Sequence, residues 1–127
     1  MNINKAILNA NDLLRKNNIK SAKLDSEILM AKAIDKKREY IILNSDNQLT
    51  KKNYEYYQHL INQRLNGKPI AYILGKKDFW KYEFKIMEGV LIPRPDSELI
   101  VEHVLNFANY KSKLNILDIG VGSGCLL

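Results

Sequence analysis

Residues 89–105 read GVLIPRPDSELIVEHVL, and two prolines in this stretch enclose Arg94 between an apolar run and a polar one. A proline ring holds φ at about −65° and removes the backbone N–H, so Pro93 can end a strand and Pro95 can begin a helix. The apolar residues that follow recur at helical spacing, and we expect five of them to face inward: Leu99, Ile100, Val104, Leu105 and Ala108. The stretch therefore predicts a junction between a strand and a helix.

The residues before this junction alternate between apolar and charged side chains. In WKYEFKI, residues 80–86, every second side chain is aromatic or aliphatic, which is the period of a strand buried on one face. A turn at Glu88 and Gly89, followed by a second strand at residues 90–92, would complete a β-hairpin over residues 79–92. The apolar face of this hairpin would consist of Trp80, Tyr82, Phe84 and Ile86.

Residues 1–67 have the pattern of a small helical domain. Helical periodicity predicts a first helix over residues 4–17 and a third over residues 36–43. Ser21 is a suitable N-cap for a second helix, because its hydroxyl can accept a hydrogen bond from a backbone N–H of the first turn. The inner stripe of that second helix is predicted to contain Leu24, Ile28, Ala31 and Ile34.

A fourth helix is predicted between two clear end signals. Thr50 can cap its first turn, and Gly67 can end it. We expect Arg64 to form an ion pair with Asp78 or Glu83 under the hairpin, and we expect the tyrosines of this region to lie in the helical core rather than to stack on RNA. One face of the helix would carry Tyr57, Leu60, Ile61, Arg64 and Leu65.

The composition is that of a globular protein of the cytoplasm. Hydrophobic residues make up 46% of the 127 and charged residues 27%, and no window reaches the roughly 18 apolar residues of a membrane span. Cys125 is the single cysteine, so no internal disulfide can form, as is usual in a reducing compartment. His59 and His103 have no second ligand four residues away on their predicted helices, so we expect no metal site.

The positive charge is concentrated in the first two thirds of the chain. The net charge is +6, and residues 1–88 hold 17 Lys and Arg against 10 Asp and Glu, whereas residues 89–127 hold 3 against 4. A basic surface of this kind can attract a nucleic acid or an RNA-rich assembly, or it can simply keep a protein soluble. We expect a solvated surface rather than direct binding of nucleic acid.

Residues 114–127, LNILDIGVGSGCLL, begin as a strand and continue into a glycine-rich turn. Glycines at 120, 122 and 124 allow positive φ and a close approach of the backbone to a ligand at the start of a helix, which Cys125 would open. Since the given sequence stops three residues after this turn, we expect the front part of a longer protein, cut within its first βα unit. A strand buried on both faces, as in α/β sheets covered by helices, is indicated by Leu114, Ile116, Leu117 and Ile119.

The spacing of the glycines distinguishes between several classes of nucleotide-binding turn. Residues 120–124 are G-x-G-x-G rather than the G-x-G-x-x-G of dinucleotide folds, and no Walker lysine follows. With Asp118 two residues before the first glycine, the turn resembles motif I of S-adenosylmethionine-dependent methyltransferases, D/E-x-G-x-G-x-G. Asp118 could attract the cationic cofactor or bond the backbone of the turn, and both can hold together. Another nucleotide fold and a purely structural turn are the alternatives.

Two further phrases resemble the release factor glutamine methyltransferase family of the HemK/PrmC type. Its members show a basic residue, then Pro-x-Ala-Tyr-x-x-Gly and a Phe-Trp pair, matched here by Arg64, Pro69, Ala71, Tyr72, Gly75, Phe79 and Trp80. They continue with Ile-Pro-Arg-Pro-Glu-Thr-Glu, where this chain has Ile92, Pro93, Arg94, Pro95, Asp96, Ser97 and Glu98. Asp for Glu and Ser for Thr keep the charge and the hydroxyl group.

The resemblance implies an α/β protein overall. Residues 1–67 would be a small all-α substrate-recognition domain, residues 68–92 a linker with the β-hairpin, and residues 93–127 the beginning of a Rossmann-like class I methyltransferase domain, truncated after its first strand and glycine-rich turn. The implied reaction transfers a methyl group from S-adenosylmethionine to the side-chain amide nitrogen of the glutamine in the Gly-Gly-Gln motif of peptide chain release factors. The implied protein is a cytoplasmic monomer that binds release factors and no membrane.

By the same resemblance, the cofactor would contact Asp118, Gly120, Val121, Gly122, Ser123 and Gly124. Arg94, Ser97 and Glu98 would lie near the cofactor or the substrate entrance. The family's Asn-Pro-Pro-Tyr motif, which holds the reacting amide, does not occur in these 127 residues, so no catalytic residue is assigned and we expect the chain alone to be inactive. Two alternatives are an adenine-N6 or RNA methyltransferase, and a non-catalytic remnant that binds a release factor or the ribosome.

Overall fold

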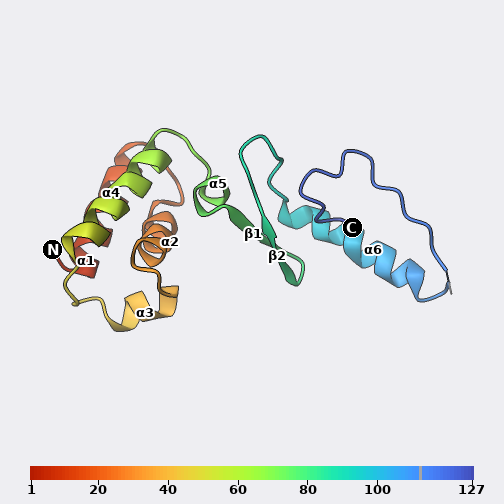
Figure 1. Cartoon of the computed structure of the whole chain (residues 1–127), viewed down its shortest axis with the longest axis horizontal. Coiled ribbons are helices and arrows are strands. Elements are labelled where there is room, and N and C mark those ends of the chain that lie inside the picture. Colours follow the sequence, from red (N-terminus) through yellow and green to blue (C-terminus); the bar gives the residue numbers. More distant parts are fainter. Residues whose placement is uncertain (112) are drawn as a thin grey trace. The chain divides into compact units, whose positions relative to one another are not determined.

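The computed structural model describes residues 1–111 and 113–127 and divides into two units, Met1–Ile73 and Leu74–Leu127. The first unit is helical and contains α1 (Ile3–Lys16), α2 (Ala22–Ile34), α3 (Arg38–Leu43) and α4 (Lys51–Leu65), followed by the short α5 (Ile70–Leu74) (Figure 1). The second contains the antiparallel strands β1 (Lys76–Phe79) and β2 (Tyr82–Lys85), a 3₁₀ turn (Pro95–Ser97) and α6 (Glu98–Ala108). The predicted helical domain and a small two-stranded sheet are therefore confirmed.

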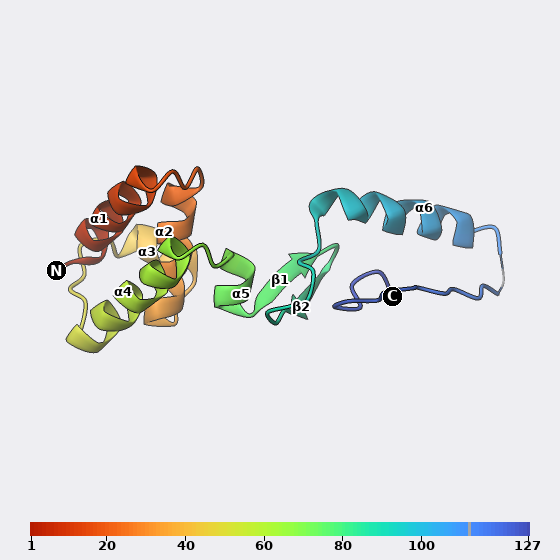
Figure 2. The same cartoon turned by 90° about the horizontal axis from the view of Figure 1, so that it is seen from above.

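Helix α2 packs against α1, α3 and α4, and the core of the helical unit lies between them (Figure 2). The predicted cap at Thr50 is confirmed, because its hydroxyl accepts a hydrogen bond from the backbone N of Asn53 at 3.1 Å. The side chain of Asn2 caps α1 in the same way, accepting from the N of Lys5 at 2.8 Å. Small and aliphatic side chains dominate this core: Ile3, Ala6, Ala10, Leu14, Ala22, Leu29, Met30, Ala33, Ile41, Tyr57, Leu60, Ile61 and Ile73.

The buried face of α2 differs from the predicted one. Leu24 is 44% exposed, and the other three residues of the predicted stripe are only half-buried. The hydroxyl of Ser21 forms no cap but donates to the carboxylate of Asp25 at 2.8 Å. The prediction was wrong because it left the charged residue Asp25 out of the buried face, whereas Asp25 lies in the core. The face that enters the core carries Ala22, Asp25, Ser26, Leu29, Met30 and Ala33.

Asp25 is buried because Arg64 of α4 reaches it. Arg64 Nε donates to Asp25 Oδ2 at 2.8 Å, and the aspartate is only 3% exposed. Arg64 Nη1 also donates to the backbone carbonyl of Lys68 at 3.3 Å. Arg64 is therefore paired, as expected, but with an acid of the helical core and not with an acid of the hairpin. A carboxylate removed from water requires such donors, because burial otherwise disfavours its charged form.

The β-hairpin forms nearer to the N-terminus than predicted. Lys76 pairs with Lys85 and Phe79 with Tyr82, so the loop consists of Trp80 and Lys81. The predicted turn at residues 88–89 is present, with Gly89 at a φ of 86° and the N of Val90 donating to the carbonyl of Met87 at 3.1 Å. It does not join two strands, because residues 90–92 form no strand. The hairpin loop was predicted at Gly89 because glycine is the usual residue for a turn with positive φ. In the loop that does join the two strands, Trp80 also has a positive φ, of 57°.

The two faces of the hairpin also differ from strict alternation. Phe79 and Ile86 are buried, whereas Tyr82 is 68% exposed. The ring of Phe84 contacts that of Phe79 edge to face, with 6.4 Å between the centroids. Lys76 Nζ lies 3.4 Å from a carboxylate oxygen of Glu83, which is therefore not the partner of Arg64.

The segments after the hairpin follow the prediction only in part. Pro95 begins the 3₁₀ turn that leads into α6, as expected. None of the residues of α6 is buried: of the predicted inward face, Ala108 is half-buried and the other four residues are exposed. The predicted strand before the glycine turn is absent, and Ile119 is 87% exposed. A strand buried on both faces needs neighbouring strands for its backbone hydrogen bonds, and the described residues supply none there.

No helix built from the described residues is long and apolar enough to cross a membrane. These residues also contain no group of three or more His, Cys, Asp and Glu side chains arranged to hold a metal ion.

The ion pair between Asp25 and Arg64 predicts a large effect of removing one partner. Arg64→Met leaves the buried carboxylate without its main donor, and we expect it to lower the free energy of unfolding by about 3–5 kcal/mol, measured by urea denaturation. The double variant Asp25→Leu with Arg64→Met removes both charges and should regain most of this loss. As a control, Lys76→Ala breaks an exposed pair and should cost less than about 1 kcal/mol. Equal losses for Arg64→Met and Lys76→Ala would contradict the prediction.

Candidate functional site

The glycine-rich turn uses the conformational freedom for which glycine is needed. Gly120, Gly122 and Gly124 have φ of 71°, 57° and 80°, all in the left-handed region that other residues avoid. Space is not the constraint, because an added Cβ would meet nothing closer than 4.0 Å at any of the three. The N of Gly124 donates to the carbonyl of Val121 at 2.9 Å and closes the turn. The predicted helix after the turn is absent, and Cys125 lies in a further turn.

Asp118 precedes this turn and has an unusual environment. Its Oδ2 atom is buried and has no hydrogen-bond partner among the described residues. Buried polar atoms are nearly always hydrogen-bonded in folded proteins, so an unpartnered carboxylate oxygen indicates a place for an external donor. A cationic group or an N–H group of a ligand would satisfy it.

The residues of the Pro93–Glu98 phrase have different roles in the structure. Arg94 is exposed, and its backbone carbonyl accepts from the N of Ser97 at 3.0 Å. Glu98 Oε1 accepts from the backbone N of Trp80 at 2.8 Å, which supports the left-handed conformation of the hairpin loop. Within the described residues, no hydrogen bond or ion pair joins Arg94, Ser97 or Glu98 to the glycine turn. The structure therefore does not bring the two predicted halves of the site into direct contact.

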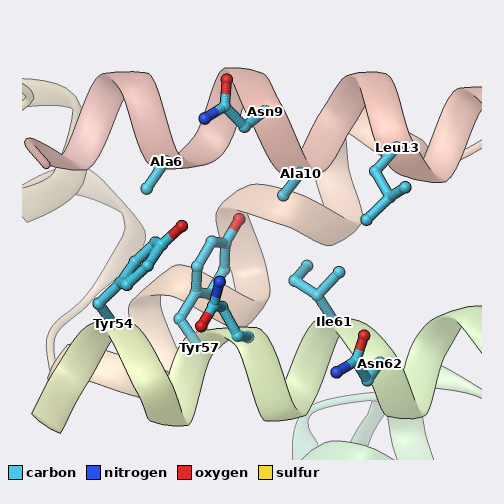
Figure 3. A pocket seen from close by; sticks show the side chains of 9 residues that line it. Ala6, Asn9, Ala10, Leu13, Tyr54, Tyr57, Ile61 and Asn62 are labelled. Carbon is cyan, nitrogen blue, oxygen red and sulfur yellow. The ribbon is translucent and has the colours of Figure 1, made fainter. Parts of the chain in front are cut away.

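A cavity of about 270 Å³ between α1 and α4 is a second candidate site (Figure 3). Ala6 and Ala10 face it from α1, and Tyr57 and Ile61 face it from α4. Amide side chains line it together with Tyr54, and within the described residues these amides form no hydrogen bond. Amides donate and accept equally well, so the cavity suits a neutral polar group of a partner. The lining amides are Asn9, Gln58 and Asn62.

Neither this cavity nor the bond between Trp80 and Glu98 was predicted from the sequence. The cavity had a signal that could have been read: Gln58 and Asn62 are four residues apart on α4, so they lie on one face of the helix, next to the apolar stripe. The bond had no local signal. It joins residues 18 positions apart and depends on the tertiary structure.

Comparisons with known proteins match the chain over most of its length. Residues 5–75 match the family described as the PrmC N-terminal domain. A release factor glutamine methyltransferase of Haemophilus influenzae is 39% identical over 120 residues, which cover 91% of this chain and 41% of that protein. One from Clostridium botulinum is 40% identical over 114 residues, covering 90% and 40% respectively. A bifunctional methyltransferase of Rickettsia conorii is 34% identical over 148 residues, 98% of this chain and 28% of the relative.

These relatives are all named as methyltransferases, which defines the class of protein to which the chain is related. More specifically, the chain belongs to the release factor glutamine methyltransferase family of the PrmC type, and it corresponds to the N-terminal portion of these proteins. The resemblance seen in the sequence is thereby confirmed. The chain spans about two fifths of the length of the first two relatives named here.

Tyr57, at the wall of the cavity, predicts a pH dependence of stability. Its hydroxyl is buried and donates to the carbonyl of Ser26 at 3.1 Å. Burial raises the pKa of Tyr57 above its ordinary value of about 10, and Tyr54 adds to the rise. The folded state therefore holds this proton more tightly than the unfolded state. Stability from this group is complete below about pH 10 and is lost as the pH rises further.

Tyr57→Phe should remove this alkaline loss of stability and cost about 1 kcal/mol at neutral pH, because the carbonyl of Ser26 loses its donor. The measurement is urea denaturation at a series of pH values from about 8 to 11. Tyr56→Phe, at a 41% exposed residue of the same helix, is the matched control and should keep the pH dependence of the wild type. An unchanged alkaline slope in Tyr57→Phe would show that this prediction is wrong.

Proposed function

We propose that this chain is part of an enzyme that transfers a methyl group from S-adenosylmethionine to the side-chain amide nitrogen of the glutamine in the Gly-Gly-Gln motif of peptide chain release factors. The observation that carries the proposal is membership of the family, at about 40% identity to named release factor glutamine methyltransferases. In this proposal residues 1–67 bind the release factor and residues 93–127 form the beginning of the catalytic domain. Residues 68–92 are the linker between these two parts. The protein would act in the cytoplasm as a monomer.

The glycine turn fits the proposed cofactor in two respects. S-adenosylmethionine has a sulfonium and an ammonium group, and when bound it supplies an electrophilic methyl group. The unpartnered Oδ2 of Asp118 is a suitable acceptor for the positively charged end. The backbone of residues 120–124, with three glycines at positive φ, offers N–H groups without side chains between them and the ligand. Val121 and Ser123 would line the same turn.

The polar residues after the hairpin, Arg94, Ser97 and Glu98, would contribute less to the cofactor site than the glycine turn does. Glu98 already accepts from the backbone of Trp80, so it positions the hairpin loop. Arg94 is exposed and Ser97 is half-buried, and neither side chain has a hydrogen bond or ion pair among the described residues. Of the three residues, Arg94 is the best placed to meet a negatively charged group of the cofactor or of the substrate, since guanidinium binds carboxylates in a bidentate manner.

The proposed reaction also needs groups that these 127 residues do not contain. An amide nitrogen is a weak nucleophile, so an enzyme must position it in line with the methyl group and polarise it. The family motif that would do this, Asn-Pro-Pro-Tyr, does not occur in the sequence. Residues 1–127 would therefore supply partner binding and one wall of the cofactor site, but not the chemical step.

Methyl transfer tests this division of roles. The chain alone, mixed with release factor and methyl-labelled S-adenosylmethionine, should transfer no label above background. Joined to the part of the Haemophilus influenzae relative that lies beyond the matched region, it should label the Gly-Gly-Gln glutamine, as read by mass spectrometry. A release factor with that glutamine replaced by asparagine is the control. Label in DNA or RNA adenine would favour the alternative methyltransferase, and transfer by the chain alone would contradict the proposal.

Titration with S-adenosylmethionine tests the cofactor turn separately. We expect the chain alone to bind more than about tenfold more weakly than the Haemophilus influenzae relative, because part of the pocket is not supplied by these residues. Asp118→Asn should weaken the remaining binding further, since it removes the negative charge but keeps the size of the side chain. Isothermal titration calorimetry gives both affinities. Equal affinity for the chain and the relative would contradict an incomplete pocket.

A further inference from the structure

The connection between α1 and α2 carries the densest positive charge of the helical unit. Residues 15–23 read RKNNIKSAK and contain four cations and no acid. All four, Arg15, Lys16, Lys20 and Lys23, are exposed. The end of α1 and the beginning of α2 therefore form a basic surface.

Two hollows in this surface share the same lysines. One, of about 540 Å³, is lined by Arg15, Lys20 and Lys23 together with Asn11 and Ile19. The other, of about 330 Å³, is lined by Lys20 and Lys23 together with Leu24, Glu27 and Arg38. We call the three cations of the first hollow, Arg15, Lys20 and Lys23, the basic corner. Cationic side chains around adjoining hollows can surround a partner side chain that enters between them, which a flat charged surface cannot do.

The two lysines of the basic corner have no ion-pair partner inside the protein among the described residues. The two arginines Arg38 and Arg64 do have partners: Arg38 lies 2.7 Å from Glu27, and Arg64 lies 2.8 Å from Asp25. Among the described residues, Lys20 and Lys23 form no ion pair. They also do not stabilise α2, because a helix begins with its positive end and favours acids there. Arg15, in contrast, is well placed for the negative end of α1.

We propose that the basic corner binds an acidic segment of the protein substrate. This inference rests on the proposed function, in which the helical unit holds a release factor. Three free cations within one surface attract carboxylates and raise the rate of association. Asn11 lines the first hollow, and its Oδ1 atom is buried with no hydrogen-bond partner among the described residues, so a peptide N–H that reached it would supply the donor that it lacks. Ile19 and Leu24 offer apolar contact beside the charges.

The same features argue against RNA as the partner. Single-stranded RNA is bound by cations interleaved with aromatic side chains on which the bases stack. Neither hollow has an aromatic residue in its lining. Glu27, in the lining of the second hollow, is paired with Arg38, which leaves Lys20 and Lys23 as the cations without an ion pair there. An acidic peptide with apolar residues fits the lining better.

Charge reversal at Lys20 and Lys23 tests this inference. The probe is the purified release factor of the same genome, labelled with a fluorophore, and binding to the whole 127-residue chain is measured by anisotropy at several salt concentrations. Lys20→Glu with Lys23→Glu should weaken binding by more than about tenfold and reduce its salt dependence. The variant should fold normally, as checked by circular dichroism and urea denaturation, because acids are favourable at the beginning of α2.

The matched control is Lys51→Glu with Lys52→Glu, at the beginning of α4. This pair gives the same change of net charge at another helix start. It also lies beside the opposite end of α1, since the N of Ile3 bonds the carbonyl of Asn47 just before α4. The control should bind within about twofold of the wild type, because only local charge pairs are strong at physiological salt.

Each other outcome would overturn the inference in a distinguishable way. Equal losses in both double variants would mean that only the net charge matters. Wild-type affinity in both would leave the proposed function standing and exclude the basic corner as the docking surface. If the wild-type chain does not bind the release factor, the partner in the proposed function fails as well. A labelled uridine oligonucleotide that binds through Lys20 and Lys23, while release factor binding is unchanged, would identify RNA as the ligand.

Discussion

The buried carboxylate of Asp25 is the constraint around which the helical unit is arranged. Its position on the inner face of α2 is tolerable only because Arg64 of α4 and the hydroxyl of Ser21 both donate to it at 2.8 Å. The other end of the guanidinium group donates to the carbonyl of Lys68, so one side chain joins α2, α4 and the segment before α5. A shift of α4 along α2 would leave a charge without a partner in the core, and the hydrophobic contacts alone would penalise it far less.

This fixed register has consequences for the surfaces of the unit. The hydroxyl of Tyr57 donates to the carbonyl of Ser26, one residue from Asp25, so the same crossing of α2 and α4 places the wall of the α1–α4 cavity. The basic corner begins where α2 begins, at the residues that flank Ser21. The α4 wall of the cavity and Lys23 of the basic corner therefore lie on two helices, α4 and α2, that buried polar bonds hold together. Sites on such elements hold their geometry better than sites on loops.

Sequence reasoning succeeded where local signals decide the structure. The periodicity of apolar residues and the cap at Thr50 placed the helices, because both act within one element. It failed where a distant contact overrides a local preference. Asp25 belongs to the core only because of Arg64, which is 39 residues away. The hairpin loop lies at Trp80 and Lys81 and not at Gly89, and the carboxylate of Glu98 accepts a hydrogen bond from the backbone N of Trp80 there. The glycines at 120, 122 and 124 adopt the expected conformation, but the strand before them needs neighbours that no local pattern provides.

The distribution of charge agrees with two ligands of opposite character. A release factor segment bound at the basic corner would have to be acidic, and the positive excess of the chain lies entirely within residues 1–88. The proposed cofactor is itself cationic at its sulfonium, so a similar excess around the glycine turn would repel it. Residues 89–127 instead hold 3 Lys and Arg against 4 Asp and Glu, with Asp118 directly before the turn. In the proposed function, attraction of the protein substrate and attraction of the cofactor are opposite electrostatic requirements, and the uneven charge of the two segments is compatible with both.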